Sequence, residues 1–216
     1  MKDKFQKKYR SVYLYIRMAK KTTKSEQTRA LIIERSAPIF NRKGYAGTSL
    51  SDLTEATKLT KGSIYGNFEN KDEVALAVFD HNFSKVNSAV AAEMSKCRSA
   101  REKLLVYGYI YSSAKDSAFP AGGCPVLNTA IESDDTHPAL RKKVIAAIHA
   151  WKKNITNVLN EGIARKEFSP GIDTEQIALT MIALIEGSIM IAKATGQDEY
   201  QLMIMKSLKA LVNDIR

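Results

Sequence analysis

The sequence predicts an all-α protein of about nine helices, in which a small three-helix head with a helix-turn-helix precedes a larger helical body. Apolar residues recur at helical spacing along most of the chain, and no sustained alternation of period two indicates a strand. Helix-breaking residues are few, since the 216 residues include only 11 Gly and 5 Pro. Helix-capping pairs such as Ser49 with Asp52 stand where the periodic segments begin. Together these observations favour helices throughout.

The same signals place each helix along the chain. Ile33, Ala37 and Phe40 share one face of the first helix, which Gly44 ends. Residues 119–125 and 169–171 are expected loops, and a proline suits the first turn of the helix at 138. Capping pairs are expected at Ser49/Asp52, Asn70/Glu73, Ser99/Glu102, Asp173/Gln176 and Asp198/Gln201. The expected helices span about 26–43, 49–56, 60–67, 71–93, 100–116, 125–134, 138–166, 173–194 and 198–214.

The net charge of +10 is concentrated at the N-terminal end. Residues 1–24 hold nine bases and one acid, whereas residues 25–80 carry −1 and residues 81–216 carry +3. We therefore expect a basic arm (1–24), a helix-turn-helix domain (25–70) and a body for ligand binding and dimerisation (71–216). Such an arm suits a polyanion, either nucleic acid or an acidic membrane surface, and a solubilising tail is the alternative. Met18 is an alternative start that would leave most of the arm outside the protein.

Several classes of protein are excluded by composition. Two cysteines are too few for a disulfide scaffold, so a reduced, cytoplasmic protein is expected. The most apolar run, 181–192, contains Glu186 and is too short for a bilayer, so no membrane partner is expected. The three histidines lack metal-ligand spacing, and phosphate-binding or dinucleotide-binding glycine loops are missing. We expect no catalytic residues, no metal and no cofactor.

Residues 44–68 form the most informative stretch. Two short apolar-periodic segments are separated by a three-residue turn at 57–59, which is the spacing of a helix-turn-helix. Ile64 and Phe68, four residues apart, form the inner face of the second segment. A pair of this kind is either a DNA-reading unit or an ordinary helical hairpin.

The outer face of that second helix suits DNA. Thr60 and Lys61 stand at its amino end, where free amides can meet phosphates and base edges. Gly62 permits close approach of the backbone, and Tyr65 offers a hydroxyl on a rigid ring. Lys61 on a guanine edge would carry the most sequence information, whereas Lys71 would clamp a phosphate.

Residues 28–79 resemble the DNA-binding head of the TetR family of bacterial transcriptional regulators. The resemblance rests on Thr-Ser-Leu-Ser-Asp-Leu-Thr-Glu-Ala from 48, Thr-Lys-Gly-Ser-Ile-Tyr-Gly-Asn-Phe from 60 and Asn-Lys-Asp-Glu-Val-Ala-Leu from 70. It implies a dimeric regulator, most often a repressor, that binds palindromic operator DNA. The DNA-binding residues that it implies are Thr48, Ser49, Lys61, Gly62, Ser63, Tyr65 and Lys71. We also expect Thr60, from its place at the amino end of the second helix, and Asn67 to bind DNA.

Two departures from the family pattern stand out. Gly66-Asn67 replaces an aromatic residue or histidine followed by histidine, so a customary phosphate contact is missing. Gly66 also weakens its helix by about 1 kcal/mol relative to alanine. Lys58 occupies the turn position where glycine is usual, and a left-handed backbone there would cost about 1 kcal/mol.

The body implies a dimer and a small inducer. Apolar stripes on the last two helices (Ile177, Met181, Leu184, Ile185 and Leu202, Met205, Leu208, Leu211) suit either a dimer interface or the core. The body is similar to the electrophile- and oxidant-responsive branch of the family in Gly123-Cys124-Pro125-Val126-Leu127-Asn128 with Glu132, in Pro138-Ala139-Leu140-Arg141 and in Ala192-Lys193-Ala194. Cys124 is then a sensor thiol activated by Lys193, and the alternatives are a packed, inert thiol and a non-covalent ligand site. The alternative function is a helical small-molecule-binding or membrane-surface protein that does not regulate transcription.

Overall fold

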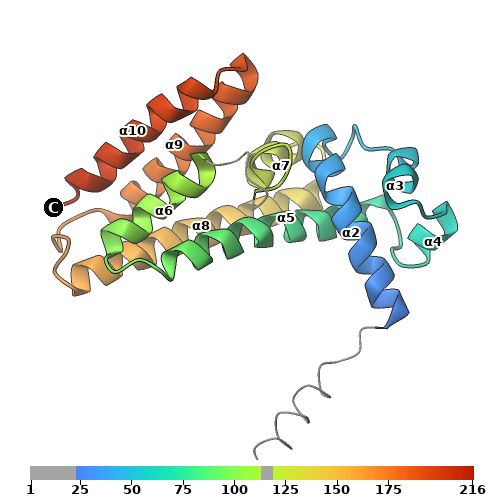
Figure 1. Cartoon of the computed structure of the whole chain (residues 1–216), viewed down its shortest axis with the longest axis horizontal. Helices are drawn as coiled ribbons and strands as arrows, with labels where there is room; N and C mark the ends of the chain where they lie inside the picture. Colours follow the sequence, from blue (N-terminus) through green and yellow to red (C-terminus); the bar gives the residue numbers. More distant parts are fainter. Residues whose placement is uncertain (1–22, 113–118) are drawn as a thin grey trace, which may run out of the picture.

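The computed structural model describes residues 23–112 and 119–216, and all regular structure in this part of the chain is helical (Figure 1). Residues 1–22 of the predicted basic arm lie outside the described residues, whereas Thr23 caps α2 and Lys24 begins it. The nine described helices are α2 (Lys24–Lys43), α3 (Leu50–Thr57), α4 (Lys61–Tyr65), α5 (Lys71–Met94), α6 (Ala100–Ser112), α7 (Pro125–Ser133), α8 (Pro138–Ala164), α9 (Thr174–Thr195) and α10 (Asp198–Asp214). This confirms the all-α prediction. Expected residues 113–116 of the sixth helix lie outside the described residues.

The head packs around its own hydrophobic cluster. Ile32 from α2, Leu53 from α3 and Ile64 from α4 are at most 1% exposed and meet in it. The first turns of α5 complete the cluster with Val74 and Val78. The head core therefore extends past the predicted boundary at residue 70, and α5 belongs to both parts of the molecule.

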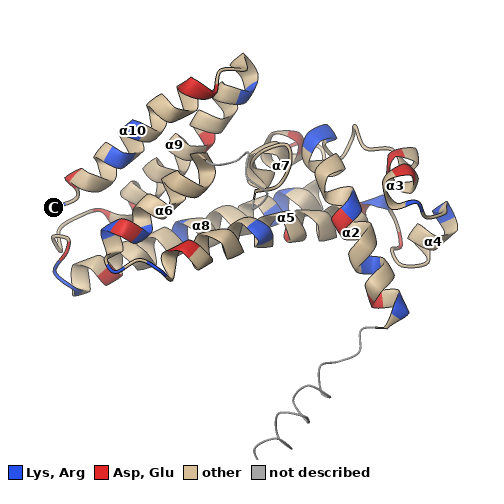
Figure 2. Cartoon of the chain, viewed as in Figure 1, with Lys and Arg blue, Asp and Glu red and all other residues tan. Residues whose placement is uncertain are grey.

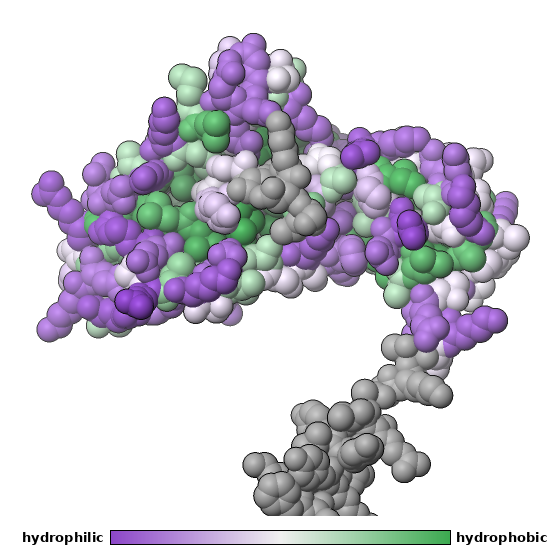
Figure 3. All heavy atoms as spheres, viewed as in Figure 1, coloured by the Kyte–Doolittle hydropathy of each residue, from purple (hydrophilic) through white to green (hydrophobic). Residues whose placement is uncertain are grey.

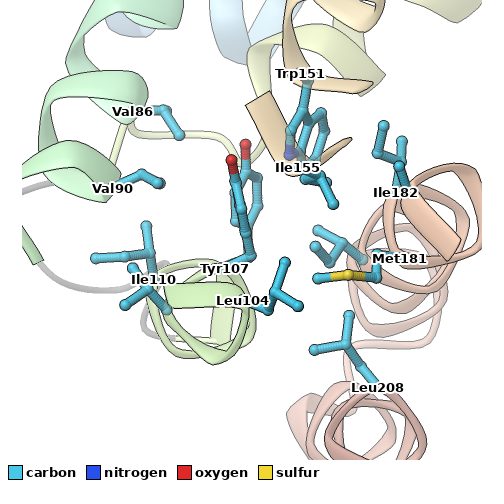
Figure 4. Close-up of a cluster of buried hydrophobic side chains, with 14 of the residues drawn as sticks. Val86, Val90, Leu104, Tyr107, Ile110, Trp151, Ile155, Met181, Ile182 and Leu208 are labelled. Carbon is cyan, nitrogen blue, oxygen red and sulfur yellow. The ribbon is translucent and has the colours of Figure 1, made fainter. Parts of the chain in front are cut away.

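A second, larger cluster fills the body. It is formed mainly by α6, α8, α9 and α10, with the second half of α5 along one side. Figure 4 shows Tyr107, Trp151 and Met181 meeting there from α6, α8 and α9. The long helices α5 and α8 pack on each other and run along the molecule, so that the head lies at one end and the C-terminus at the other (Figure 1).

The predicted caps explain most helix starts. The hydroxyl of Ser49 accepts from the Asp52 N–H and the Asp52 carboxylate accepts from the Ser49 N–H, and Asn70, Ser99 and Asp173 likewise receive the expected amides. The pair Asp198/Gln201 is wrong. Gln197 is the N-cap residue of α10, and the Gln201 side chain instead donates to the Tyr111 carbonyl at 2.8 Å.

Helix α9 is more apolar than the sequence pattern suggested. Its 22 residues are long and apolar enough, by length and composition alone, to cross a membrane. In the structure it packs against α6, α8 and α10, with Met181 and Ile185 fully buried. Core packing thus accounts for the inner part of its apolar surface.

Lys58 has the left-handed backbone expected from its position in the turn. Its φ is 57°, immediately after α3. Lys58→Gly should therefore raise the free energy of unfolding by about 0.5–1 kcal/mol, because glycine adopts this conformation without strain. Urea unfolding measures the effect. Glu55→Gly, at an exposed position inside α3, is the matched control and should destabilise instead. An equal decrease in the free energy of unfolding of both variants would show that the Lys58 backbone is not strained.

Candidate nucleic-acid interface and ligand core

Helix α4 presents the predicted recognition surface. The Thr60 hydroxyl caps its amino end by accepting the Ser63 N–H at 3.1 Å. Ile64 is fully buried against the head core, so the opposite face is turned outward. Lys61 and Gly62 are exposed and Tyr65 is 37% exposed, while Ser63 is half-buried. This end of the molecule lies far from the C-terminus, and Figure 2 shows basic residues along α2 and at the start of α4.

The start of α3 carries a second polar group beside this surface. Ser49 is exposed, and its hydroxyl donates to the Asp52 carboxylate at 2.8 Å. Lys43 contacts the same carboxylate at 2.7 Å. The hydrogen bond from Lys43 and those from Ser49 hold the pKa of Asp52 below its usual range. Ser49 and Lys43 are therefore oriented by one acid.

Thr48 does not reach this surface with its side chain. The residue is fully buried, and its hydroxyl donates to the Gly44 carbonyl at 2.6 Å. The expectation that Thr48 contacts DNA through its side chain is therefore wrong, since the hydroxyl closes the turn before α3.

Asn67 links the end of the recognition helix to α2. Its amide donates to the Ser63 carbonyl at 2.9 Å, and its Oδ1 accepts from the Ser25 hydroxyl at 3.1 Å. Arg29 donates to the Asn67 backbone carbonyl and pairs with Glu73 at 2.6 Å. The half-buried Asn67 thus orients α4 relative to α2.

Lys71 and its neighbours converge on Tyr45, a residue that the sequence interpretation did not select. The Lys71 ammonium lies 4.3 Å from the centre of the Tyr45 ring, and the Tyr45 hydroxyl donates to Asp72. That hydrogen bond raises the pKa of Tyr45 to about 12. His137, which caps α8, meets the same ring edge-on at 4.5 Å. Tyr45 is therefore one of the points where head and body touch.

One carboxylate of the body holds the backbone of the head at this point. Glu132 of α7 accepts from the Tyr45 N–H at 2.6 Å and from the Ala46 N–H at 2.7 Å. Gly44 has φ 73°, and a Cβ there would lie 2.5 Å from the Glu132 carboxylate. The glycine therefore serves both the turn and the close approach of the acid. A cavity of about 20 Å³ adjoins the contact, which is room for about one water molecule.

A second network joins α2 to the loop before α7. The Asn41 side chain donates to the carbonyls of Ala121 and Gly123, both at 2.9 Å. Asn128 of α7 donates to the Asn41 and Gly122 carbonyls, also at 2.9 Å. These hydrogen bonds therefore tie the loop and α7 to the last turn of α2.

Lys193 belongs to this network and does not activate the thiol. Its ammonium donates to Asn128 Oδ1 at 2.9 Å and to the Gly122 carbonyl at 3.1 Å. Cys124 is fully buried, and its thiol instead donates to Glu186 Oε1 at 2.9 Å. Burial and the nearby carboxylate raise the pKa of Cys124 well above its usual range. The predicted Lys193–thiolate pair is therefore wrong, because the partner of the thiol is an acid.

Glu186, Glu132 and the two asparagines were missed as functional residues. A single acid inside the apolar run 181–192 was the available signal for Glu186. Asn128 and Glu132 belong to the family pattern that begins at Gly123, but the pattern does not show their partners, which lie 87 residues away in the chain.

Known proteins resemble both parts of the chain. Residues 32–78 match the family model described as bacterial regulatory proteins, tetR family, and residues 100–208 match that of the tetracyclin repressor-like C-terminal domain. A solved TetR-family regulator from Cytophaga hutchinsonii is 54% identical, with a TM-score of 0.88 over 91% of this chain and 98% of that chain. One from Chloroflexus aurantiacus is 37% identical, with a TM-score of 0.84 over 89% and 97%. The regulator TtgR of Pseudomonas putida is 28% identical over 76% of this chain and 80% of its own length.

Proposed function

The chain belongs to the TetR family of transcriptional regulators, and we propose that it is a homodimeric repressor that leaves a palindromic operator when a small molecule occupies its body. The observation that carries this proposal is the outward face of α4, whose Lys61, Gly62 and Tyr65 are exposed over a buried Ile64. A two-fold dimer places two such helices in successive major grooves, about 34–36 Å apart. A body conformation that changes this separation releases the DNA.

The proposed dimer interface lies on α9 and α10. Half of the predicted stripe is buried core, since Met181, Ile185, Met205 and Leu208 are at most 8% exposed. The outward apolar residues are 47–61% exposed, and they are Leu202 of that stripe together with Leu179, Met190 and Met203 outside it. Apolar surface is visible on the body in Figure 3, bordered by hydrophilic side chains. Residues of this kind are covered in a stable dimer, and a monomer that binds a palindrome tightly would contradict the proposal.

The recognition helix is tested by comparing two lysines. Lys61→Ala should cost about 1–3 kcal/mol on the operator and relax its base preference, because this side chain stands where base edges are read. Lys71→Ala should weaken all duplexes similarly and reduce the slope of log K against log salt by about 1. Titrations of selected operator and random duplexes at several salt concentrations measure both. Equal losses of Lys61→Ala on operator and random DNA would show a phosphate contact only.

Release by a non-covalent ligand is favoured over thiol modification. Cys124 is fully buried and its pKa is raised, so little of the reactive thiolate forms, whereas Cys97 is half-buried. N-ethylmaleimide should therefore label Cys97 first and leave operator binding intact. Mass spectrometry of wild type, Cys97→Ser and Cys124→Ser measures the labelling. Rapid labelling of Cys124 with loss of operator binding would contradict this expectation and show that modification of the thiol releases the operator.

A further inference from the structure

The body contains a carboxylate oxygen that lacks a partner. Glu186 Oε1 accepts from the Cys124 thiol, whereas Oε2 is buried and has no hydrogen-bond partner within the described part of the chain. A buried carboxylate loses its hydration, and it recovers that free energy only from a donor or a cation. Glu186 therefore has the capacity for one more strong partner.

The nearby lysine does not compensate this charge. Lys193, on the same helix, donates to Asn128 and to the Gly122 carbonyl. Burial raises the pKa of Glu186 to about 7, and only the bond from Cys124 opposes that rise. Ionisation of Glu186 therefore costs free energy, because the buried carboxylate is poorly solvated. A ligand cation beside the carboxylate would offset this cost.

Aromatic rings lie beside the acid. Tyr111 stacks on Trp151, with ring centres 4.9 Å apart and planes at 10°, and it meets Phe119 edge-on at 5.3 Å. Cys124, the partner of the acid at 2.9 Å, belongs to the same buried cluster as Tyr111, Phe119 and Trp151.

The aromatic group has an unused polar atom of its own. Trp151 is only 3% exposed, and its indole N–H has no acceptor among the described residues. Figure 4 shows Trp151 in the buried cluster with Tyr107, which comes from a different helix. Ring faces attract cations and offer flat apolar area, and the N–H can donate to an acceptor on a ligand.

We propose that the body binds an organic amine with a flat aromatic portion, whose protonated nitrogen donates to Glu186 Oε2 while its ring packs against Tyr111 and Trp151. This rests on the proposed function, because it names the chemical class of the inducer. A cation compensates the desolvated carboxylate, a neutral analogue leaves it uncompensated, and an anion is repelled by it. The order of affinity is therefore amine, alcohol, acid.

Three probes with one ring system test this order: 2-naphthylmethylamine, 2-naphthylmethanol and 2-naphthoate. Titration calorimetry on the full-length dimer should show the amine binding at least about tenfold more tightly than the alcohol, with the acid weakest. The amine should also release the operator. An alcohol or acid that binds as tightly as the amine, or no amine binding at millimolar concentration, would overturn the proposal.

Glu186→Gln isolates the charge, because the amide oxygen can still accept from the Cys124 thiol. The amine should bind about 10- to 100-fold more weakly to this variant, and the alcohol about as before. Glu175→Gln is the matched control, since Glu175 is an exposed acid on the same helix. Unchanged amine affinity in Glu186→Gln would refute the site.

Operator binding without probe, measured on the same preparations, separates the two proposals. Retained operator binding with no preference for the amine overturns the ligand class alone, whereas absent operator binding by wild type overturns the proposed function. Circular dichroism confirms that each variant is folded. The emission of Trp151, the single tryptophan, reports whether the amine reaches the aromatic stack.

Discussion

Glu132→Ala will weaken operator binding by about tenfold or more while leaving the recognition helix intact. The variant removes the carboxylate that receives the Tyr45 and Ala46 N–H groups, and the half-buried Tyr45 N–H loses its acceptor. Loss of two charge-assisted hydrogen bonds costs about 2–3 kcal/mol at this contact. The head is then less firmly oriented on the body, so the two recognition helices match successive grooves less often.

Salt dependence separates this effect from a lost DNA contact. Glu132 donates nothing to a phosphate, so the slope of log K against log salt should stay unchanged as affinity falls. Asp135→Ala removes an exposed acid just after α7 and is the control, with wild-type affinity expected. If Glu132→Ala binds the operator as tightly as Asp135→Ala, the carboxylate does not position the head.

Glu186→Gln will make the protein more stable above neutral pH. The folded-state pKa of Glu186 is raised by burial from 4.5 to about 7, so the unfolded chain releases this proton first as pH rises. The stability of the wild type therefore decreases between those two values, and the full cost is present above pH 7. The Gln variant lacks this cost, and its advantage should grow by about 2 kcal/mol between pH 5 and pH 8.

Urea unfolding at several pH values measures the difference between the two proteins. Protein concentration must be held fixed, because the proposed dimer would dissociate as it unfolds. Glu175→Gln should follow the wild-type profile in the acidic range, since Glu175 is exposed and paired only with Lys152 on the surface. Parallel pH profiles for wild type and Glu186→Gln would mean that the acid is solvated.

The helices could be predicted because their signals are local. Ser49, Asn70, Ser99 and Asp173 each cap a helix with an amide two or three residues away, so position in the sequence is enough. Asp198 shows the limit of the method. It has the right spacing to Gln201, yet the Gln201 side chain donates its hydrogen bond to the Tyr111 carbonyl of α6.

The hydrogen-bond partners of side chains in the body could not be predicted, because they come from helices that are distant in the sequence. Cys124 lies at the end of the 119–124 loop, and Lys193 reaches the same loop from α9. Which polar group each side chain contacts depends on how α7 and α9 pack. A family pattern with a cysteine after the glycines and a lysine in the penultimate helix suggested a thiolate, whereas the structure gives the thiol a carboxylate partner. The exposed face of α4 was predictable, because the burial of Ile64 follows from helical periodicity alone.

The contact between Gly44 and Glu132 restricts how this protein can be recombined with its relatives. Any side chain at residue 44 would face a strained backbone and displace the carboxylate, whose atoms lie 2.5–2.8 Å from the required Cβ. A chimaera that carries residues 23–78 onto a foreign body will keep its operator affinity only if that body supplies an acid equivalent to Glu132. Operator choice and ligand choice can thus be exchanged between such proteins only when both members of this contact are inherited together.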